Sequence, residues 1–161
     1  MSDRAAELAR ELGLAIHPEG GLYREVYRSN SPVYPADGRG SRPAITGIYF
    51  LLRAGAVSRW HRVLSDELWH FYEGAPLELW SASPSGDQVQ RHLLGACSDT
   101  HEPMLTVRAG WWQAARSTGA YTLVGCTVGP GFDFSDFVLA ADIPSAAAVF
   151  RAHDPALAEL L

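Results

Sequence analysis

Two histidines and a glutamate lie within ten residues of one another near the middle of the chain, in the segment GAVSRWHRVLSDELWHFYEG, residues 55–74. Side chains alternate between the two faces of a β-strand, so two adjacent strands in this segment would place His61 and Glu67 opposite each other. A carboxyl group and an imidazole that meet in an apolar interior have shifted pKa values, and such a pair can remove and return a proton on a small molecule. The segment therefore predicts an acid–base pair, with His70 on the other face of its strand.

Four further residues are candidates for the walls of the same site. Arg59 shares the predicted strand face of His61 and could hold a carboxylate or phosphate with two hydrogen bonds. Gln113 could orient a substrate oxygen through its amide, while Trp69 and Trp111 are the tryptophans that we expect to line the pocket. A second interpretation remains open, in which these polar residues form a buried network without chemistry, because buried polar groups must be paired in any case.

The N-terminal stretch HPEGGLYREVYR, residues 17–28, is the second candidate region. Its Glu-Gly-Gly sequence favours a tight turn into a strand, on which Tyr23 and Glu25 share one face. One interpretation places Tyr23 and Glu25 at the mouth of the pocket. The other makes the stretch an edge or swapped strand, whose charges prevent aggregation or pair across a dimer.

The composition excludes several classes of protein. The chain has 161 residues, of which 47% are apolar and 19% charged, enough apolar material for a folded core. A formal charge of -5 and the lack of a long basic run argue against nucleic acid or an anionic membrane as a partner. No apolar run reaches the roughly 18–20 residues that a membrane-spanning helix needs. Cys97 and Cys126 form no CxxC motif, and we expect reduced thiols in a cytoplasmic protein.

The hydrophobic pattern predicts a β-rich chain with a helix at each end. Helical spacing occurs at residues 3–12 and 144–161, with Pro155 opening a short final turn. Between them, short segments rich in aromatic and β-branched residues are separated by Gly, Pro, Asp and Ser, which is typical of a sandwich, jelly roll or barrel. The expected strands are 22–29, 45–53, 57–63, 67–72, 77–83, 88–94, 104–108, 111–116, 121–128 and 134–139.

These segments resemble the cupin superfamily. The spacing of Gly55, His61, Glu67 and Gly74 is that of the first cupin signature, G-x5-H-x-H-x3-E-x6-G, while the second signature is weakly similar around Gly110. The stretches that resemble cupin subfamily five in particular are 17–29, 58–74, 109–115 and 123–140. The resemblance implies an all-β, cupin-type jelly-roll barrel with short N-terminal and C-terminal helices. We expect one cupin domain over residues 1–161, with the barrel core at about 17–141.

The departures from the cupin pattern concern the metal. A metal-binding cupin has three histidines and one glutamate, whereas this chain has Val63 at the second histidine position and Gln113 at the last. Only His61, Glu67 and Gln113 could hold a divalent metal, and catalytic metal sites usually need three good donors. We therefore expect no cofactor, with a weakly bound metal as the alternative.

The leading hypothesis is a small-molecule-binding cupin, an isomerase or epimerase acting on a small polar or anionic metabolite. His61 and Glu67 would be its base and acid. The alternatives are a binding or sensing cupin without catalysis, and a weakly metal-dependent enzyme. Cupins of this sort are usually dimers, and the aromatic, poorly charged strands would expose much apolar edge in a monomer, so we expect a homodimer.

Overall fold

A computed structural model of the chain describes residues 3–161. Its elements, in chain order, are α1 (Arg4–Glu11), β1 (Ala15–Ile16), β2 (Leu22–Arg28), β3 (Pro32–Val33), β4 (Arg42–Pro43), β5 (Thr46–Arg53), β6 (Val57–Val63), β7 (Asp66–Gly74), β8 (Leu77–Ala82), β9 (Val89–Leu94), β10 (Met104–Val107), β11 (Trp112–Ser117), β12 (Tyr121–Gly129), η1 (Phe134–Asp136), β13 (Phe137–Leu139), η2 (Ala140–Asp142), α2 (Pro144–His153) and α3 (Pro155–Ala158). Within these residues no helix is long and apolar enough to cross a membrane.

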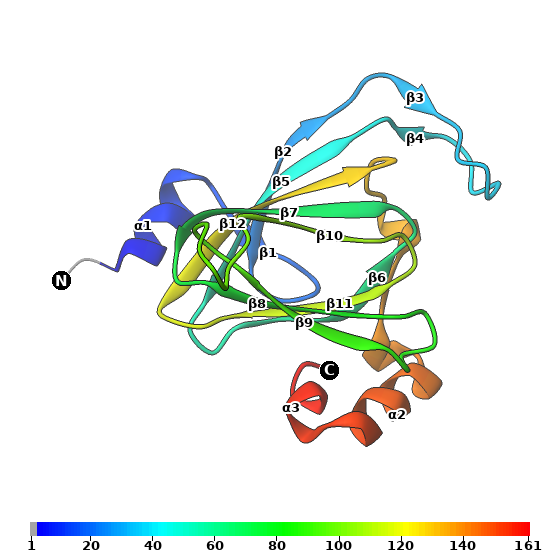
Figure 1. Ribbon diagram of the computed structural model, residues 1–161. Coiled ribbons are helices and arrows are strands. Elements are labelled where there is room, and N and C mark those ends of the chain that lie inside the picture. Colours follow the sequence, from blue (N-terminus) through cyan, green and yellow to red (C-terminus); the bar gives the residue numbers. More distant parts are fainter. Residues whose placement is uncertain (1–2) are drawn as a thin grey trace.

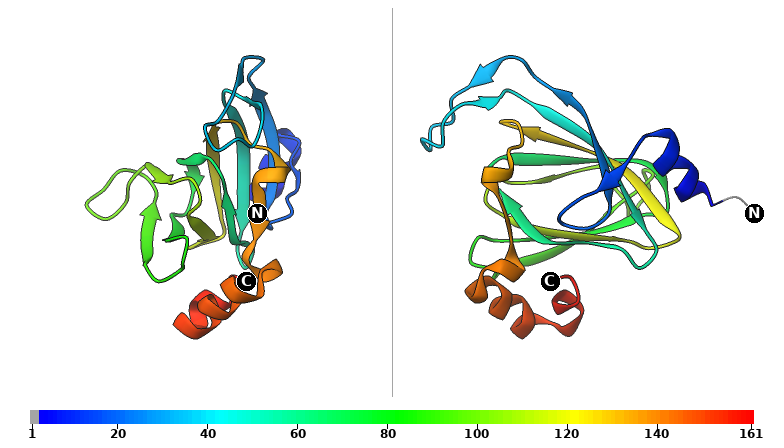
Figure 2. Two further views of the ribbon diagram at one scale, coloured as in Figure 1. Left: turned by 90° about the vertical axis from the view of Figure 1, so that its right-hand side faces the viewer. Right: turned by 180° about the vertical axis from the view of Figure 1, so that it is seen from behind.

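Two antiparallel sheets face each other and enclose the interior (Figure 1). One has the strand order β1-β2-β5-β12-β7-β10, and the other has the order β13-β6-β11-β8-β9. Strands that are distant in sequence are therefore neighbours, and β12 lies between β5 and β7. The predicted jelly-roll fold is confirmed. The segment between β2 and β5 contains the short paired strands β3 and β4 and forms an arm that projects beyond the barrel (Figure 2).

The predicted strands from 22 to 128 agree with β2 and β5–β12 to within two residues at each end. The prediction for 134–139 is wrong in its first half, which forms the 3-10 helix η1. The reason is local, because the Asp133 carboxylate accepts a hydrogen bond from the Ser135 backbone N–H at 2.8 Å and caps that turn. The C-terminal helix prediction holds as two helices, which divide at Pro155.

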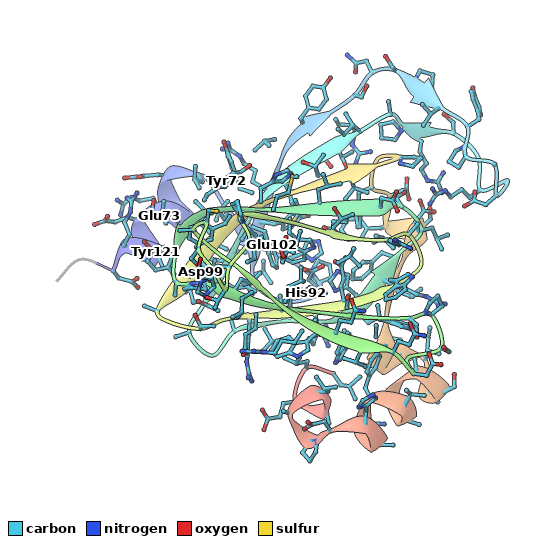
Figure 3. All side chains as sticks on the ribbon, viewed as in Figure 1. Tyr72, Glu73, His92, Asp99, Glu102 and Tyr121 are labelled. Atoms are coloured by element: carbon cyan, nitrogen blue, oxygen red, sulfur yellow. The ribbon has the colours of Figure 1, made fainter. Side chains whose placement is uncertain are left out.

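The helices cover part of the outer face of each sheet. On the five-stranded sheet, Phe150 of α2 stacks on Trp60 of β6 with ring centroids 4.1 Å apart. On the six-stranded sheet, α1 is held by Arg4, whose Nε donates to Glu73 at 2.9 Å, and Tyr121 donates to the same carboxylate at 2.7 Å (Figure 3). Both layers bury apolar side chains, which is the main stabilising contribution to such a packing.

The apolar core fills only one end of the barrel interior. Its buried members include Phe50, Leu79 and Val124, which lie in the middle of their strands. The other end, formed by the start of β5, the end of β12 and the β6–β7 turn, is hollow. The fold therefore places a cavity beside the segment that carries His61 and Glu67.

Candidate functional site

The cavity has a volume of about 480 Å³ and opens at the end of the barrel next to β2. Four buried carboxyl and imidazole side chains line it, and so does the buried Cys126 thiol; the four are His17, Glu19, His61 and Glu67. The remaining walls are mainly apolar and aromatic, with Ile48 and Val128 as examples. A concave, largely apolar site with a few converging polar groups is the usual form of a small-molecule site.

A tight turn at the N-terminal side of β2 brings two of these groups into the barrel. The His17 backbone N–H donates to the Gly21 carbonyl at 3.1 Å, and Arg59 N–H of β6 donates to the Glu19 carbonyl at 2.8 Å. Gly20 has φ +107°, a conformation that side chains with a Cβ rarely adopt. The turn therefore fixes His17 and Glu19 against the inner face of β6.

A β-bulge in β6 sets the direction of its side chains. Gln113 pairs with His61 and Ala115 pairs with Ser58, so two residues of β6 oppose one residue of β11. Because the alternation shifts there, Ser58 and His61 both reach Glu19: Ser58 Oγ donates to Oε1 at 2.7 Å, and His61 Nε2 lies 3.2 Å from Oε2.

The same bulge corrects the prediction for Arg59. Its side chain turns away from the cavity, and its Nη2 donates to the Pro18 carbonyl at 2.7 Å. Arg59 is absent from the cavity lining, so the strand-face argument that grouped it with His61 was wrong. Simple alternation failed because it assumed an unbroken strand.

Glu67 is held from behind by a chain of hydrogen bonds. Gln113 Nε2 donates to the Glu67 carboxylate, and Trp69 Nε1 donates to Gln113 Oε1 at 2.9 Å. The side chains of Gln113 and Trp69 are buried, and neither contributes to the cavity lining. Trp111 is partly buried and packs against the apolar core, also outside the lining. All three predicted wall residues lie outside the cavity, and two of them, Gln113 and Trp69, support Glu67 from there.

Burial has the largest influence on the pKa values of the four carboxyl and imidazole groups, and it also raises the pKa of the Cys126 thiol. It raises the pKa of Glu67 to about 7, an effect that the nearby His61 opposes and the nearby Glu19 reinforces. Burial also raises the pKa of Glu19 and lowers the pKa values of His17 and His61. All four groups therefore favour their uncharged forms, and Glu67 changes protonation near neutral pH.

The mouth of the cavity contains the predicted residues of β2. Tyr23 and Glu25 both line it, and the Tyr23 ring meets the His17 ring edge-on with centroids 4.4 Å apart. Glu25 accepts two hydrogen bonds from Arg28, at 2.9 and 2.8 Å, and Arg28 also donates to the Phe132 carbonyl at 3.1 Å. Arg28, oriented by Glu25 of the same strand, thus joins β2 to the loop after β12.

Sequence reasoning missed His17, Glu19 and Arg28 as lining residues. The stretch from 17 to 28 was identified as a candidate region, but only Tyr23 and Glu25 were assigned to a pocket. A signal existed in His-Pro-Glu-Gly-Gly, since two ionisable residues beside a glycine turn can be carried into a site by that turn. His70 lies on the other strand face, where its Nε2 is 3.2 Å from Thr127 Oγ1.

The donor set does not fit the metal cage of a cupin. Val63 lines the cavity without offering a ligand atom, and both ends of the Gln113 amide are engaged by Trp69 and Glu67. Among residues 3–161 no group of three His, Cys, Asp or Glu side chains has the arrangement for a metal ion. The buried carboxyl and imidazole groups of the lining can exchange protons.

Comparison with known proteins agrees with this geometry. The sequence model of a family described as the cupin superfamily (DUF985) matches residues 6–140. No curated protein matches the chain.

Two solved structures are similar over nearly the whole chain. A hypothetical protein from Leishmania major is 30% identical with a TM-score of 0.87, and the match covers 97% of each chain. A structural-genomics protein from Shewanella oneidensis is 34% identical with a TM-score of 0.84, covering 97% of this chain and 96% of that one. KdgF from Halomonas sp. is 13% identical with a TM-score of 0.52, covering 75% and 87%, which shows the fold alone.

Proposed function

Because this chain belongs to the DUF985 family of the cupin superfamily, we propose that its barrel cavity binds a small polar molecule and moves a proton on it. The observation that carries this proposal is Glu67, a buried carboxyl group that lines the cavity near His61 and has a pKa of about 7. A group with such a pKa exists in both protonation states at neutral pH, as an acid–base catalyst requires. The reaction class is isomerisation or epimerisation next to a carbonyl.

The charges around the cavity favour an uncharged ligand over an anionic one. Arg59, the predicted anion anchor, lies outside the lining. Arg28 lines the mouth, but Glu25 holds it with two hydrogen bonds, and Asp133 adds a second carboxyl group there. A hydroxylated neutral molecule can instead hydrogen-bond to the buried polar groups and pack against the aromatic wall.

The test is proton exchange with solvent. A panel of neutral sugars and other α-hydroxycarbonyl compounds is incubated with the protein in deuterated water, and exchange at carbon is followed by NMR. We expect Glu67→Gln to slow exchange by at least about a hundredfold, the usual scale for a general acid–base group. Glu73→Gln is the matched control, because Glu73 lies on the same strand and pairs with Arg4 away from the cavity. Exchange by Glu67→Gln at the wild-type rate contradicts the proposal.

Binding without catalysis is the second candidate, and one observation favours it. The polar groups of the cavity floor are already paired with one another, as in the contacts from Gln113 to Glu67 and from Ser58 to Glu19. Such a network is stable without chemistry. Calorimetric binding of a neutral sugar with no carbon-bound exchange would favour this candidate.

We also propose that two copies of the chain associate through the outer face of the six-stranded sheet. The strand register places Tyr49, Gly125, His70 and Met104 in one row across this face. Met104 is 51% exposed, and Tyr72 beside this row is 52% exposed. The row continues from Tyr49 to Arg24, whose guanidinium lies over the Tyr49 ring, and its other members carry no carboxylate or ammonium group. The exposed apolar side chains of such a face suit a symmetric contact with a second copy.

A further inference from the structure

The hydrogen bond at one nitrogen of His61 determines what the other nitrogen can do. Nδ1 lies 2.7 Å from the Arg59 carbonyl oxygen, which can only accept a hydrogen bond. Nδ1 therefore carries a hydrogen. In the neutral ring Nε2 then has a free lone pair, and this nitrogen faces Glu19 Oε2 at 3.2 Å.

A proton must lie between these two atoms. An ionised carboxylate offers only lone pairs, so it cannot form a hydrogen bond with a nitrogen that also offers one. The histidine ring is only 2% exposed and Glu19 is 7% exposed, so water has little access to this contact. The pair is satisfied only when one proton is shared between Oε2 and Nε2.

The second histidine does not supply this proton. His17 Nδ1 lies 3.4 Å from the same Oε2, but it accepts a hydrogen bond from the Glu19 backbone N–H at 3.2 Å. A nitrogen that accepts has no hydrogen of its own. Oε2 of Glu19 thus lies between two imidazole nitrogens that carry no hydrogen, so neither can donate to it, and His61 Nε2 finds its donor in a protonated Glu19.

We propose that Glu19 and His61 hold one proton between them, carried by the Glu19 carboxyl group in the resting protein, and that Glu19 is the proton donor of the site while Glu67 is the acceptor. This inference rests on the proposed function for the step on a substrate, but the resting protonation state is independent of it. Ser58, whose hydroxyl donates to Glu19 Oε1 at 2.7 Å, is a positioning residue that leaves Oε2 as the protonated oxygen.

The buried setting agrees with this placement of the proton. Burial raises the pKa of Glu19 and lowers the pKa of His61, so the carboxyl group keeps the proton. The other charged or titratable groups near the pair act in both directions: His17 and Arg59 favour an ionised Glu19, while Glu67 favours a protonated His61. Desolvation has the largest influence on the pKa of Glu19 and on the pKa of His61.

The reaction on an α-hydroxycarbonyl compound is balanced with these groups alone. Ionised Glu67 takes the proton from the carbon next to the carbonyl, and the C–H electron pair forms a C=C bond. The carbonyl π electrons move to oxygen, which takes the proton from Glu19. Return of one proton from Glu67 to carbon, and of a hydroxyl proton to Glu19, gives the isomer and restores both groups.

The test measures the resting protein, without a substrate. Infrared difference spectra of wild type and Glu19→Gln are recorded at about pH 8, where Glu67, with its pKa of about 7, is mostly ionised. We expect a protonated-carboxyl band that Glu19→Gln removes. Nitrogen-15 NMR of labelled histidine should give the neutral Nδ1–H form for His61. Absence of the band, or an imidazolium at His61, overturns the proposal.

Glu19→Gln is chosen so that loss of the infrared band does not result from misfolding. A glutamine at 19 can donate to His61 Nε2 through its amide nitrogen and accept from Ser58 through its oxygen, so the contacts of the site remain. Glu25→Gln is the matched control, since Glu25 lines the same cavity but is paired with Arg28. The band must persist in this control.

The kinetic outcome separates the two proposals. If a substrate is found, Glu19→Gln should slow carbon-bound exchange at least about tenfold while binding changes little, because the donor role acts in the reaction step. Exchange at the wild-type rate overturns the donor role. If no compound exchanges, the proposed function fails, and the spectra still decide the protonation of Glu19.

Discussion

Glu67 shows how one buried carboxyl group links activity to stability. Its pKa is raised from 4.5 to about 7, mainly by burial, with His61, Glu19, Gln113 and Cys126 as its other influences. The folded protein therefore binds this proton more tightly than the unfolded chain does. The free energy of unfolding therefore falls as pH rises from about 4.5 to about 7. Above that pH range the whole destabilising effect of the buried, ionised Glu67 is present.

Glu67→Gln should remove this dependence. One pKa unit corresponds to about 1.4 kcal/mol. The difference in free energy of unfolding between variant and wild type should therefore shift in favour of the variant by on the order of 3 kcal/mol from pH 4 to pH 8. Denaturant unfolding of both proteins at the two pH values measures the difference. Glu73→Gln serves as control, and an equal pH dependence in wild type and Glu67→Gln contradicts the assignment.

At the residue scale, the sequence predictions depended on strand alternation and were limited by it. Alternation put His61 and Glu67 at one site, and both line the cavity, although His61 lies directly beside the bulge of β6. Arg59 was misplaced because a bulge has no marker that a single sequence displays. Glu19 was missed because its position depends on a turn that folds back across β6, a long-range contact.

That turn is the element on which the site depends, and Gly20 is its tightest point. A Cβ at Gly20 would overlap the Val57 carbonyl oxygen, in addition to the strain of φ +107°. Gly55 provides a matched control, with φ +77° and no atom within 4 Å of its Cβ position. The two glycines share the backbone strain, and only Gly20 has the steric clash.

Gly20→Ala should therefore be the more damaging substitution. We expect Gly55→Ala to lower the free energy of unfolding by about 1 kcal/mol, and Gly20→Ala to lower it by at least about 1–2 kcal/mol more. Gly20→Ala should also weaken the Glu19 carboxyl band in the infrared spectrum. Equal stability losses in thermal or denaturant unfolding would show that the turn is not tightly packed against β6.

The elements themselves were mostly readable from the sequence. Strands of four or more residues carry enough alternation and β-branched content to be recognised, and β2 and β5–β12 were. The two-residue strands β1, β3 and β4 are too short to show a period. The segment at 134–136 was predicted as strand, but it contains Ser135 and Asp136, which favour turns, and the side chain of Asp133 caps a 3-10 turn there.

At the scale of the whole molecule, the barrel is filled at one end and hollow at the other. Its closed end is predictable as apolar, since Phe50, Leu79 and Val124 come from strongly hydrophobic strands. The open end is not predictable from periodicity, because the turn at 17–21 and the loop at 132–134 complete it from opposite ends of the chain. The cavity forms only when the tertiary fold brings these two segments together.

The outer face of the six-stranded sheet gives the last prediction. Part of it is covered by α1, where Leu8 packs with Leu51 and Leu123. The rest lies open, and the Tyr72 side chain rests over Gly125, where a side chain would collide with it. Gly125 leaves room for this ring, and the exposed side chains of Tyr72 and Met104 offer apolar area for contact with a second copy.

Tyr72→Asp should therefore weaken association without unfolding the monomer. A buried, unpaired charge on each copy should raise the dimer dissociation constant at least about tenfold. Sedimentation velocity over a range of concentrations measures it. Tyr34→Asp is the control, because Tyr34 is 77% exposed on the projecting arm and should not alter association. A wild-type chain that stays monomeric, or equal effects of the two variants, rules out this face as the contact.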